Sequence, residues 1–525
     1  MPIKKEDEQV IDNLLLNESL QLIAKGTGII LAGTFIGSIL AAIFPIIIAR
    51  YYTPVEFGIY ALAMTIFIFI TRIAYLGLDD GCPRNISFYR GKKDINKVKN
   101  VIISSFEFIL FSSILLSVLL FFSSDWISLN IFNNQNLAWP LRILSLALPF
   151  YLLAGIIISI FRGYDQSKEN VYFQHILTGS GKIILIIPVI ILGLSFNYVF
   201  IALAANIIFV FLLTLFYYKF KKPDELKVKK TIKSPIKKEL IFFSLPLVFS
   251  GMSWFLLQGT DKFMIGFIMG EYDVGLYNAA CTIATYLNIF LVSIMFIYQP
   301  VGTRLFGASK NYELKELYKT ITKWVFLLAS PFIMFVILQP KTTISILFGS
   351  EYYGAIIPLI ILFLTYTIRI CLGPAGGSII MLGKTKQIMY IVGSMAIMNI
   401  VLNWFLIPIY GISGAAIATG ASIVLLSFFE LVYLYKISKI QPIKKLYLKI
   451  LFFFLLSMGI FYLIFLYSPI SFTFSIRIIF VILSYFLFLI FLVVFKLFRE
   501  EDLLIIKLIE QKIGIRIPFI RKIIR

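Results

Sequence analysis

The chain has 525 residues, of which 60% are hydrophobic and only 14% are charged, and its mean hydropathy is +0.93. A soluble globular protein carries about 25% charged residues and needs polar groups over its surface, so this composition excludes a soluble protein and indicates a polytopic membrane protein. The formal net charge of +21 indicates basic loops beside an anionic cytoplasmic leaflet, and we expect no nucleic-acid partner.

The N-terminal stretch MPIKKEDEQVIDNLLLNESLQLIAK is rich in charge. It carries too many charges for the apolar core of a signal peptide. We therefore expect residues 1–24 to be a cytoplasmic segment, with a short amphipathic helix lying on the membrane as its simplest structure.

Fourteen apolar segments follow, each close to the roughly 20 residues that a membrane-spanning helix needs. The seventh segment is long, so we expect it to be tilted or broken. The predicted spans are 27–49, 56–78, 99–122, 138–161, 171–193, 197–218, 239–266, 274–299, 320–339, 354–373, 385–407, 413–436, 447–467 and 474–497. The predicted fold is an all-α polytopic membrane protein with 14 transmembrane helices.

The loops between these spans alternate in charge. Those after even-numbered spans are basic, as in GKKDINKVKN and KFKKPDELKVKKTIKSPIKK. Those after odd-numbered spans carry almost no Lys or Arg, with Arg50 and Lys341 as the main exceptions. The positive-inside rule then predicts that both termini are cytoplasmic. An odd number of spans would break this alternation, so fourteen is favoured over thirteen or fifteen.

Two stretches recur at nearly the same offset along the chain. VEFGIYALAMT (55–65) matches YDVGLYNAACT (272–282), with Gly58 over Gly275. IIPVIILGLSFNYVFIALA (186–204) resembles LIPIYGISGAAIATG (406–420), which we interpret as a short outer turn ending at Gly411 and a small-residue helix face. The repeat predicts a duplicated six-span unit. Because six is even, the two copies enter the membrane in the same orientation and are related by a pseudo-twofold axis along the membrane normal.

This interpretation divides the chain into six parts. They are the cytoplasmic segment 1–24, an N-terminal six-helix lobe 25–218, a basic cytoplasmic linker 219–238, a C-terminal six-helix lobe 239–436, helices 13 and 14 at 437–497, and a basic cytoplasmic tail 498–525. Two such lobes enclose a central cleft, and rocking one lobe against the other exposes the cleft to alternate sides of the membrane.

Several stretches resemble the polysaccharide-biosynthesis proteins, the oligosaccharide-lipid flippases of the multidrug/oligosaccharidyl-lipid/polysaccharide exporter superfamily. They are ARYYTPVEFGIYALA (49–63), TDKFMIGFIMGEYDVGLYNAA (260–280), LFGSEYYGAIIPLIIL (347–362) and NWFLIPIYGISGAAIAT (403–419). Each stretch is chiefly a glycine-and-proline turn, so their order and spacing carry the resemblance.

The resemblance implies a transporter and not an enzyme, with no catalytic residue and no cofactor. Its substrate would be an oligosaccharide linked through diphosphate to a polyprenyl lipid, moved by alternating access from the cytoplasmic to the outer face of a prokaryotic plasma membrane. An ion gradient or consumption of the flipped product would supply the energy. The candidate partners are membrane lipid, glycosyltransferases and a glycan polymerase, and the expected oligomeric state is a monomer.

Charged residues inside the predicted spans are the candidate site residues, because an intramembrane charge costs about 2.5–3.5 kcal/mol on insertion scales and calls for a partner or a function. Cations suit a diphosphate, and the planar fork of arginine suits it best. The candidate substrate-binding residues are Arg50, Arg72, Lys182, Lys262, Arg304 and Arg369. Asp261 is the candidate ion-coupling residue.

Each assignment has a structural alternative. Arg72 and Asp261 could form intramembrane ion pairs, while Arg50 could reach the headgroups and Arg304 could anchor at the interface. The resemblance places the spans of Lys182 and Arg369 away from the cleft. Asp79 and Asp80 lie beside a basic loop, where we expect solvated charges.

Other sites are not predicted. The single His175 and the scattered Cys82, Cys281 and Cys371 have neither metal-ligand spacing nor a disulfide framework. The stretch GPAGGS (373–378) lacks the Gly-Lys-Ser/Thr of a nucleotide loop.

Three other functions remain open. A lipid-linked peptidoglycan precursor flippase would show arginines clustered early in spans 1 and 2, where this chain has Lys25 and Arg72. A small-cation or multidrug exporter on the same scaffold would show an acidic cleft and twelve spans. A membrane glycan polymerase would need a sizeable external loop, and the predicted outer loops are short.

Overall fold

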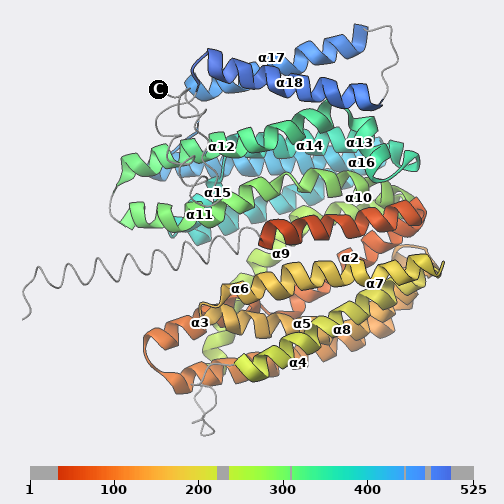
Figure 1. Ribbon diagram of the computed structural model, residues 1–525. Helices are drawn as coiled ribbons and strands as arrows, with labels where there is room; N and C mark the ends of the chain where they lie inside the picture. The colour runs from red at the N-terminus through yellow and green to blue at the C-terminus, as the bar shows by residue number, and fades with distance from the viewer. Residues whose placement is uncertain (1–32, 222–235, 308–309, 443–444, 468–473, 498–525) are drawn as a thin grey trace, which may run out of the picture.

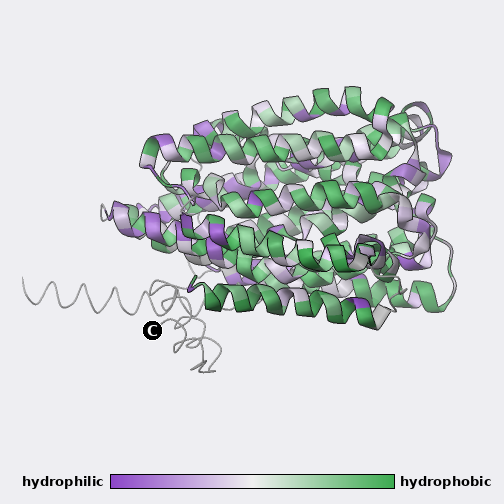
Figure 2. Cartoon of the chain, turned by 90° about the horizontal axis from the view of Figure 1, so that it is seen from above, coloured by the Kyte–Doolittle hydropathy of each residue, from purple (hydrophilic) through white to green (hydrophobic). Residues whose placement is uncertain are grey.

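The computed structural model describes residues 33–221, 236–307, 310–442, 445–467 and 474–497. The predicted N-terminal segment, most of the linker and the C-terminal tail lie outside these ranges. The described chain is a bundle of long helices without strands. Hydrophilic residues gather toward the ends of the helices, and hydrophobic residues cover their middle portions (Figure 2).

The helices of the first half are Gly33–Tyr51, α2 (Pro54–Ala74), α3 (Leu78–Gly91), α4 (Ile95–Trp126), α5 (Ala138–Gly163), α6 (Ser167–Asn170), α7 (Thr178–Ile191) and α8 (Asn197–Lys221). The first half also contains three short elements: π segments at Ile127–Ile131 and Val171–Leu177 and a 3-10 turn at Gln135–Leu137. The start of α2 is set by a capping box between Thr53 and Glu56 with Pro54 in the first turn, which satisfies free backbone N–H groups.

The helices of the second half are α9 (Ile236–Ile268), α10 (Glu271–Thr285), α11 (Asn288–Gly307), α12 (Asn311–Leu338), α13 (Pro340–Leu347), α14 (Ile356–Leu372), α15 (Ala375–Met381), α16 (Thr385–Ser438), α17 (Lys445–Tyr467) and α18 (Phe474–Val494). A 3-10 turn at Ser350–Ala355 precedes α14. Figure 1 shows α3, α4, α5 and α8 grouped on one side and α11, α12, α14 and α16 on the other. The last two helices, α17 and α18, lie at the far edge and pack on α12.

Thirteen helices of the described chain are long and apolar enough to cross a membrane. One of them, α16, has 54 residues, and at about 1.5 Å per residue a straight helix of that length would far exceed the roughly 30 Å bilayer core. Its backbone leaves the helical region at Gly411 (φ 59°, ψ −141°). The Asn399 amide also donates to the Thr419 hydroxyl at 3.1 Å, twenty residues further on. The element is therefore two antiparallel arms that turn at Gly411, which is consistent with fourteen spans.

The second span is broken, which the sequence pattern did not reveal. Helix α2 ends at Ala74, and the chain passes through positive φ at Leu76 (51°) and Gly77 (69°) before α3 begins. A Cβ at Gly77 would lie 2.3 Å from the Ser244 carbonyl oxygen of α9. Glycine is therefore required here both for its conformation and for this close approach.

The two copies of the repeated motif touch each other where α2 packs against α10. A Cβ on Gly58 would lie 1.8 Å from the Glu271 carbonyl oxygen, and a Cβ on Gly275 would lie 2.1 Å from the Pro54 carbonyl oxygen. Each glycine thus faces the residue four positions before the other glycine. This reciprocity is the geometry that a local twofold axis between two segments produces.

Aromatic side chains surround this contact. The Phe57 ring of α2 lies 6.0 Å from the Phe348 ring and 5.9 Å from the Tyr352 ring of the second half, measured between centroids. All three side chains are fully buried. We call this the outer end, because the charge pattern assigns its turns to the outside. The two halves are packed tightly together at the outer end.

Alanine at Gly58 or Gly275 is expected to lower the midpoint of thermal unfolding. The added Cβ meets backbone oxygen, which cannot move aside, and overpacking of this kind costs about 1–3 kcal/mol. The matched control is Gly459→Ala in α17, where a Cβ meets no atom within 4 Å. The measurement is thermal unfolding of the purified proteins in detergent. If G58A and G275A unfold at the same temperature as G459A, the close approach is wrong.

Candidate functional site

A cavity of about 610 Å³ lies between α2, α3 and α9, and we call it the cleft cavity. Its polar wall is formed by Arg72, Asp79 and Asp80 from the first half and by Gln258 and Lys262 from α9. Helix α9 packs against both halves, and it adds Lys262 to the cavity that Arg72 also lines. The cleft cavity thus receives cations from the two halves of the chain.

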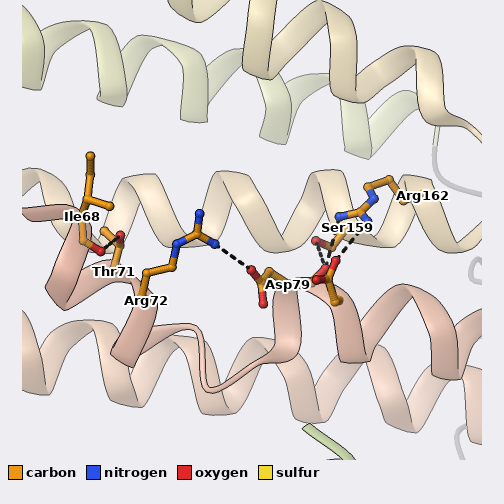
Figure 3. Close-up of polar contacts among 7 residues, drawn as sticks. Ile68, Thr71, Arg72, Asp79, Ser159 and Arg162 are labelled. Atoms are coloured by element: carbon orange, nitrogen blue, oxygen red, sulfur yellow. Dashed lines mark hydrogen bonds and ion pairs between the residues drawn. The ribbon is translucent and has the colours of Figure 1, made fainter. Parts of the chain in front are cut away.

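The break between α2 and α3 positions the charges of the first half. An Arg72 guanidinium nitrogen lies 3.5 Å from Asp79 Oδ2 (Figure 3). On an unbroken helix, residues seven apart would be separated by about 10 Å. Side-chain exposure of 47% for Arg72 and 29% for Asp79 leaves the guanidinium open to the cavity. Asp79 is the ion-pair partner of Arg72 among the described residues.

Arg162 of α5 completes this charge network. It donates to Asp80 Oδ1 at 3.1 Å and to the Asp79 carbonyl oxygen at 3.4 Å, and the Ser159 hydroxyl donates to the same carbonyl at 2.9 Å. Figure 3 shows Arg72 and Arg162 on opposite sides of Asp79. The expectation that Asp79 and Asp80 are merely solvated is therefore incomplete, because both line the cleft cavity. The same charges line a second cavity of about 410 Å³ within the first half.

Asp261 lies at the centre of a buried polar cluster in the second half. Asp261 is only 2% exposed. Its Oδ2 accepts hydrogen bonds from the Tyr277 hydroxyl at 2.6 Å and from the Thr419 hydroxyl at 3.3 Å. Asp261 Oδ1 accepts from the Lys262 backbone N–H at 2.8 Å. The residue lines a central cavity of about 260 Å³, together with Lys262. A buried carboxylate requires such hydrogen bonds to remain inside a membrane protein.

Two asparagines extend the cluster. The Asn403 amide donates to Asn399 Oδ1 at 3.0 Å, and the Asn399 amide donates to the Thr419 hydroxyl at 3.1 Å. Both asparagines are fully buried, and Asn403 Oδ1 has no hydrogen-bond partner among the described residues. The result is a directed chain of donors that ends on Asp261. The sequence analysis missed these residues, although their spacing in NIVLN (399–403) puts two amides on one face of a transmembrane helix.

The remaining predicted cations lie in different places. Arg369 lines a pocket of the second half and donates to the Ser427 hydroxyl at 3.3 Å. The Lys182 ammonium lies 5.9 Å from the Phe44 ring centroid. Lys182 lines none of four cavities: the cleft cavity, the 410 Å³ cavity, the 260 Å³ cavity and the pocket that Arg369 lines. The backbone of Arg304 belongs to α11, but its side chain lies outside the described part of the structure. Their substrate-binding roles stay predictions.

Arg50 joins the two halves at the outer end. It donates to the carbonyl oxygens of Ser345 at 2.7 Å, of Leu347 at 3.2 Å and of Ile346. These are the last carbonyls of α13, where the helix dipole and unpaired backbone oxygens attract a cation. Arg50 lines none of the four cavities. The geometry therefore gives it a contact between the halves, and its predicted role in substrate binding has no cavity contact to support it.

A helical membrane protein with two halves, a charged cavity between them and a tight contact between them at one end has the architecture of a membrane transporter. The family model described as "Polysaccharide biosynthesis protein" matches residues 23–305, more than half of the chain, and the MatE model matches residues 246–405. The chain belongs to the polysaccharide biosynthesis protein family, whose members are membrane transporters and not enzymes.

Relatives of this chain include two proteins of surface glycan assembly. A protein assigned as an O-antigen transporter in Shigella flexneri is 23% identical over 392 residues, which cover 72% of this chain and 89% of the relative. The capsular polysaccharide biosynthesis protein CapF of Staphylococcus aureus is 24% identical over 201 residues, covering 38% of this chain and 50% of the relative.

Solved structures share the fold. An inward closed conformation of the lipid II flippase MurJ superposes with a TM-score of 0.70 at 19% identity, covering 88% of this chain and 98% of that one. An inward-facing multidrug transporter of the MATE family superposes with a TM-score of 0.63 at 16% identity, covering 77% and 94%. The predicted all-α transporter fold is thus confirmed.

Arg50→Ala is expected to loosen the outer end, because it removes three hydrogen bonds between the halves. Spin labels at Val55 and Tyr353, both exposed at this end, report the separation as a distance distribution. Arg50→Ala should broaden the distribution and shift it to longer distances, whereas Arg50→Lys should give a smaller shift because one ammonium cannot serve three carbonyls equally. An unchanged distribution in Arg50→Ala would show that the contact does not hold the halves together.

Proposed function

We propose that this protein is a flippase that moves polyprenyl-diphosphate-linked oligosaccharide from the cytoplasmic to the outer face of a prokaryotic plasma membrane. The observation that carries the proposal is that Arg72 of the first half and Lys262 of the second half line the same cleft cavity. A diphosphate is an anion of two linked groups, and cations from two lobes can bind both of them at once. The family and its glycan-assembly relatives support the class of substrate.

The ion pair of Arg72 suits a binding step. Its 3.5 Å separation from Asp79 Oδ2 and its 47% side-chain exposure describe a weak pair that a stronger anionic ligand can replace. Asp79 would then keep the Arg72 side chain extended toward the cavity when no substrate is bound. The planar guanidinium presents two parallel N–H groups to a phosphate, and the Lys262 ammonium adds a point charge from the opposite lobe.

The tight outer end supports an alternating-access mechanism. Gly58 packs against Gly275 and Arg50 is bound to α13, and these contacts would separate the cleft cavity from the outside, with both termini and the basic loops facing the cytoplasm. Substrate would enter from the cytoplasmic leaflet. Parting of the lobes at the outer end would then release it.

We propose that the protein acts as a monomer that receives its substrate from membrane glycosyltransferases and supplies a glycan polymerase.

The Asp261 cluster supports coupling to a cation gradient. Two hydroxyls donate to the Asp261 carboxylate, and the amides of Asn399 and Asn403 extend the chain from Thr419. Within the described part of the chain no basic side chain hydrogen-bonds to Asp261, and Lys262 lines the same cavity. Oxygen ligands of this kind suit a small hard cation or a proton. Because Asp261 and Lys262 are neighbours on α9, a cation at Asp261 would act directly on the helix that lines the cleft cavity.

Two alternatives keep some support. The MurJ fold likeness favours a lipid-linked peptidoglycan precursor, which shares the polyprenyl diphosphate but differs in its headgroup. The MATE likeness favours a small-cation or multidrug exporter, and here Asp79 and Asp80 supply acids to the cleft cavity. Binding of a polyprenyl diphosphate by Arg72 would argue against the exporter.

Arg72→Ala is expected to reduce glycan export while the protein level stays normal. Loss of a charge-assisted contact of about 1.5–3 kcal/mol should weaken diphosphate binding roughly 10–100-fold. In a strain lacking the native gene, surface glycan should fall and lipid-linked sugar should accumulate on the cytoplasmic side. Arg142→Ala is the matched control, because Arg142 also pairs with an aspartate, Asp125, but lines none of the four cavities. Normal export with Arg72→Ala would remove Arg72 from the site.

Asp261→Asn is expected to abolish the dependence of transport on a cation gradient. The asparagine amide keeps the size of the side chain and part of its hydrogen bonding. It cannot carry the negative charge that would balance a bound cation or take up a proton. Transport into proteoliposomes should be measured with a sodium gradient, a proton gradient and neither. The control is Asp165→Asn, at a side chain 84% exposed. Gradient-dependent transport that persists in Asp261→Asn would place the coupling site elsewhere.

A further inference from the structure

A pocket of about 580 Å³ lies within the second half of the chain, beside the cleft cavity, and we call it the C-lobe pocket. The two spaces share the side chains of Trp254 and Gln258 as a common wall. A molecule whose anionic part lies between Arg72 and Lys262 could therefore extend past Trp254 into the C-lobe pocket. The volume lies within the range of small-molecule sites, roughly 300–1,000 Å³.

The floor of the C-lobe pocket holds an unsatisfied carboxylate. Glu430 of α16 is only 3% exposed, and its Oε1 has no hydrogen-bond partner among the described residues. The Arg369 guanidinium and the Gly376 backbone N–H stabilise the charge of the same carboxylate. A Cβ at Gly376 would lie 2.5 Å from Glu430 Oε1, so the carboxylate packs closely against this glycine. A buried carboxylate oxygen without a donor is costly, and a bound ligand with a donor would relieve that cost.

The walls of the C-lobe pocket combine an aromatic face with neutral amides. Trp254 is half-buried, and the Arg369 guanidinium carbon lies 5.7 Å from its ring centroid. Arg369 is oriented by its bond to the Ser427 hydroxyl. The amides of Gln258, Asn288 and Gln299 line the pocket and supply both donors and acceptors. Apolar side chains fill the remaining wall.

This set of groups fits a sugar better than the other parts of a lipid-linked glycan. A pyranose ring has an apolar face that packs on an aromatic side chain and a rim of hydroxyls that need amide and carboxylate partners. An alkyl chain would leave the amides and Glu430 unpaired. A phosphate would meet the negative charge of Glu430 beside the positive charge of Arg369, so the pocket offers it no excess of positive charge. An N-acetyl or hydroxyl group presents the donor that Glu430 lacks.

We propose that the C-lobe pocket is the glycan subsite of the transporter. In this arrangement Trp254 stacks on a sugar near the diphosphate, and Glu430 accepts a hydrogen bond from a hydroxyl or N-acetyl N–H of a neutral sugar. Glu430 thereby selects against a uronic acid at that position, since two carboxylates would repel each other. This inference rests on the proposed function, because it assumes that the diphosphate lies in the cleft cavity.

The test separates the sugar from the diphosphate. Binding of farnesyl diphosphate and of farnesyl-diphospho-N-acetylglucosamine to the purified full-length protein is measured by titration calorimetry in detergent. The sugar should tighten binding by wild type about tenfold or more. Glu430→Gln should lose most of this gain while binding farnesyl diphosphate as wild type does, which also shows that this variant is folded. Trp254→Ala should also lose most of the gain, and because Trp254 lines the cleft cavity too, its gain is measured relative to its own affinity for farnesyl diphosphate. Glu313→Gln, at an exposed glutamate of α12, is the matched control.

The outcomes distinguish the two proposals. If the sugar adds no affinity, or if the gain survives in Glu430→Gln and Trp254→Ala, the glycan subsite is wrong even where Arg72→Ala still weakens farnesyl diphosphate. Tighter binding of the glucuronic acid analogue than of the N-acetylglucosamine compound would also overturn it. If Arg72→Ala leaves farnesyl diphosphate binding unchanged, the diphosphate site of the proposed function fails instead, and the sugar-dependent gain still decides the subsite.

Discussion

The close approach of Gly58 to Gly275 is the contact on which the rest of the structure depends. Nothing larger than glycine fits at either position, because each would-be Cβ meets a backbone oxygen within about 2 Å of it. In lipid, helices are held together by close packing and by polar contacts, since the hydrophobic effect does not favour one helix surface over a lipid tail. Two glycines at the outer end thus bring α2 and α10 together, and the cleft cavity lies beyond that contact.

The second constraint is the cost of charge inside a membrane. Two acids that line the cavities are held by specific partners: Asp79 by Arg72 and Asp261 by Tyr277 and Thr419. Glu430 differs, because one of its oxygens is left without a donor. Fully satisfied groups are suited to holding helices in place, whereas an unsatisfied group beside a pocket is suited to a ligand. The cost of burying a charge therefore distinguishes acids that hold helices in place from an acid that is a candidate for ligand binding.

Hydropathy and loop charge predict the helices well, because every spanning segment must satisfy its own backbone in lipid. Gly58 and Gly275 also revealed the repeat, and their structural contact is reciprocal. The break at Leu76 and Gly77 was not predictable, since Gly77 faces Ser244 from a distant helix. That break pairs Arg72 with Asp79. The positions of Asn399, Asn403 and Glu430 around cavities likewise depend on helix rotation, which an apolar pattern without strong periodicity does not fix.

The central claim is that the lobes must part at the outer end for substrate to cross. Cysteines at Phe57 and Tyr352, whose ring centroids lie 5.9 Å apart across that end, can be joined by a short, reducible bis-thiol cross-linker in a chain that lacks Cys82, Cys281 and Cys371. Translocation of a fluorescent polyprenyl-diphosphate saccharide is then followed in proteoliposomes. Cross-linking is expected to stop translocation, and reduction of the linker is expected to restore it. Translocation at an unchanged rate with the two lobes cross-linked would contradict the account.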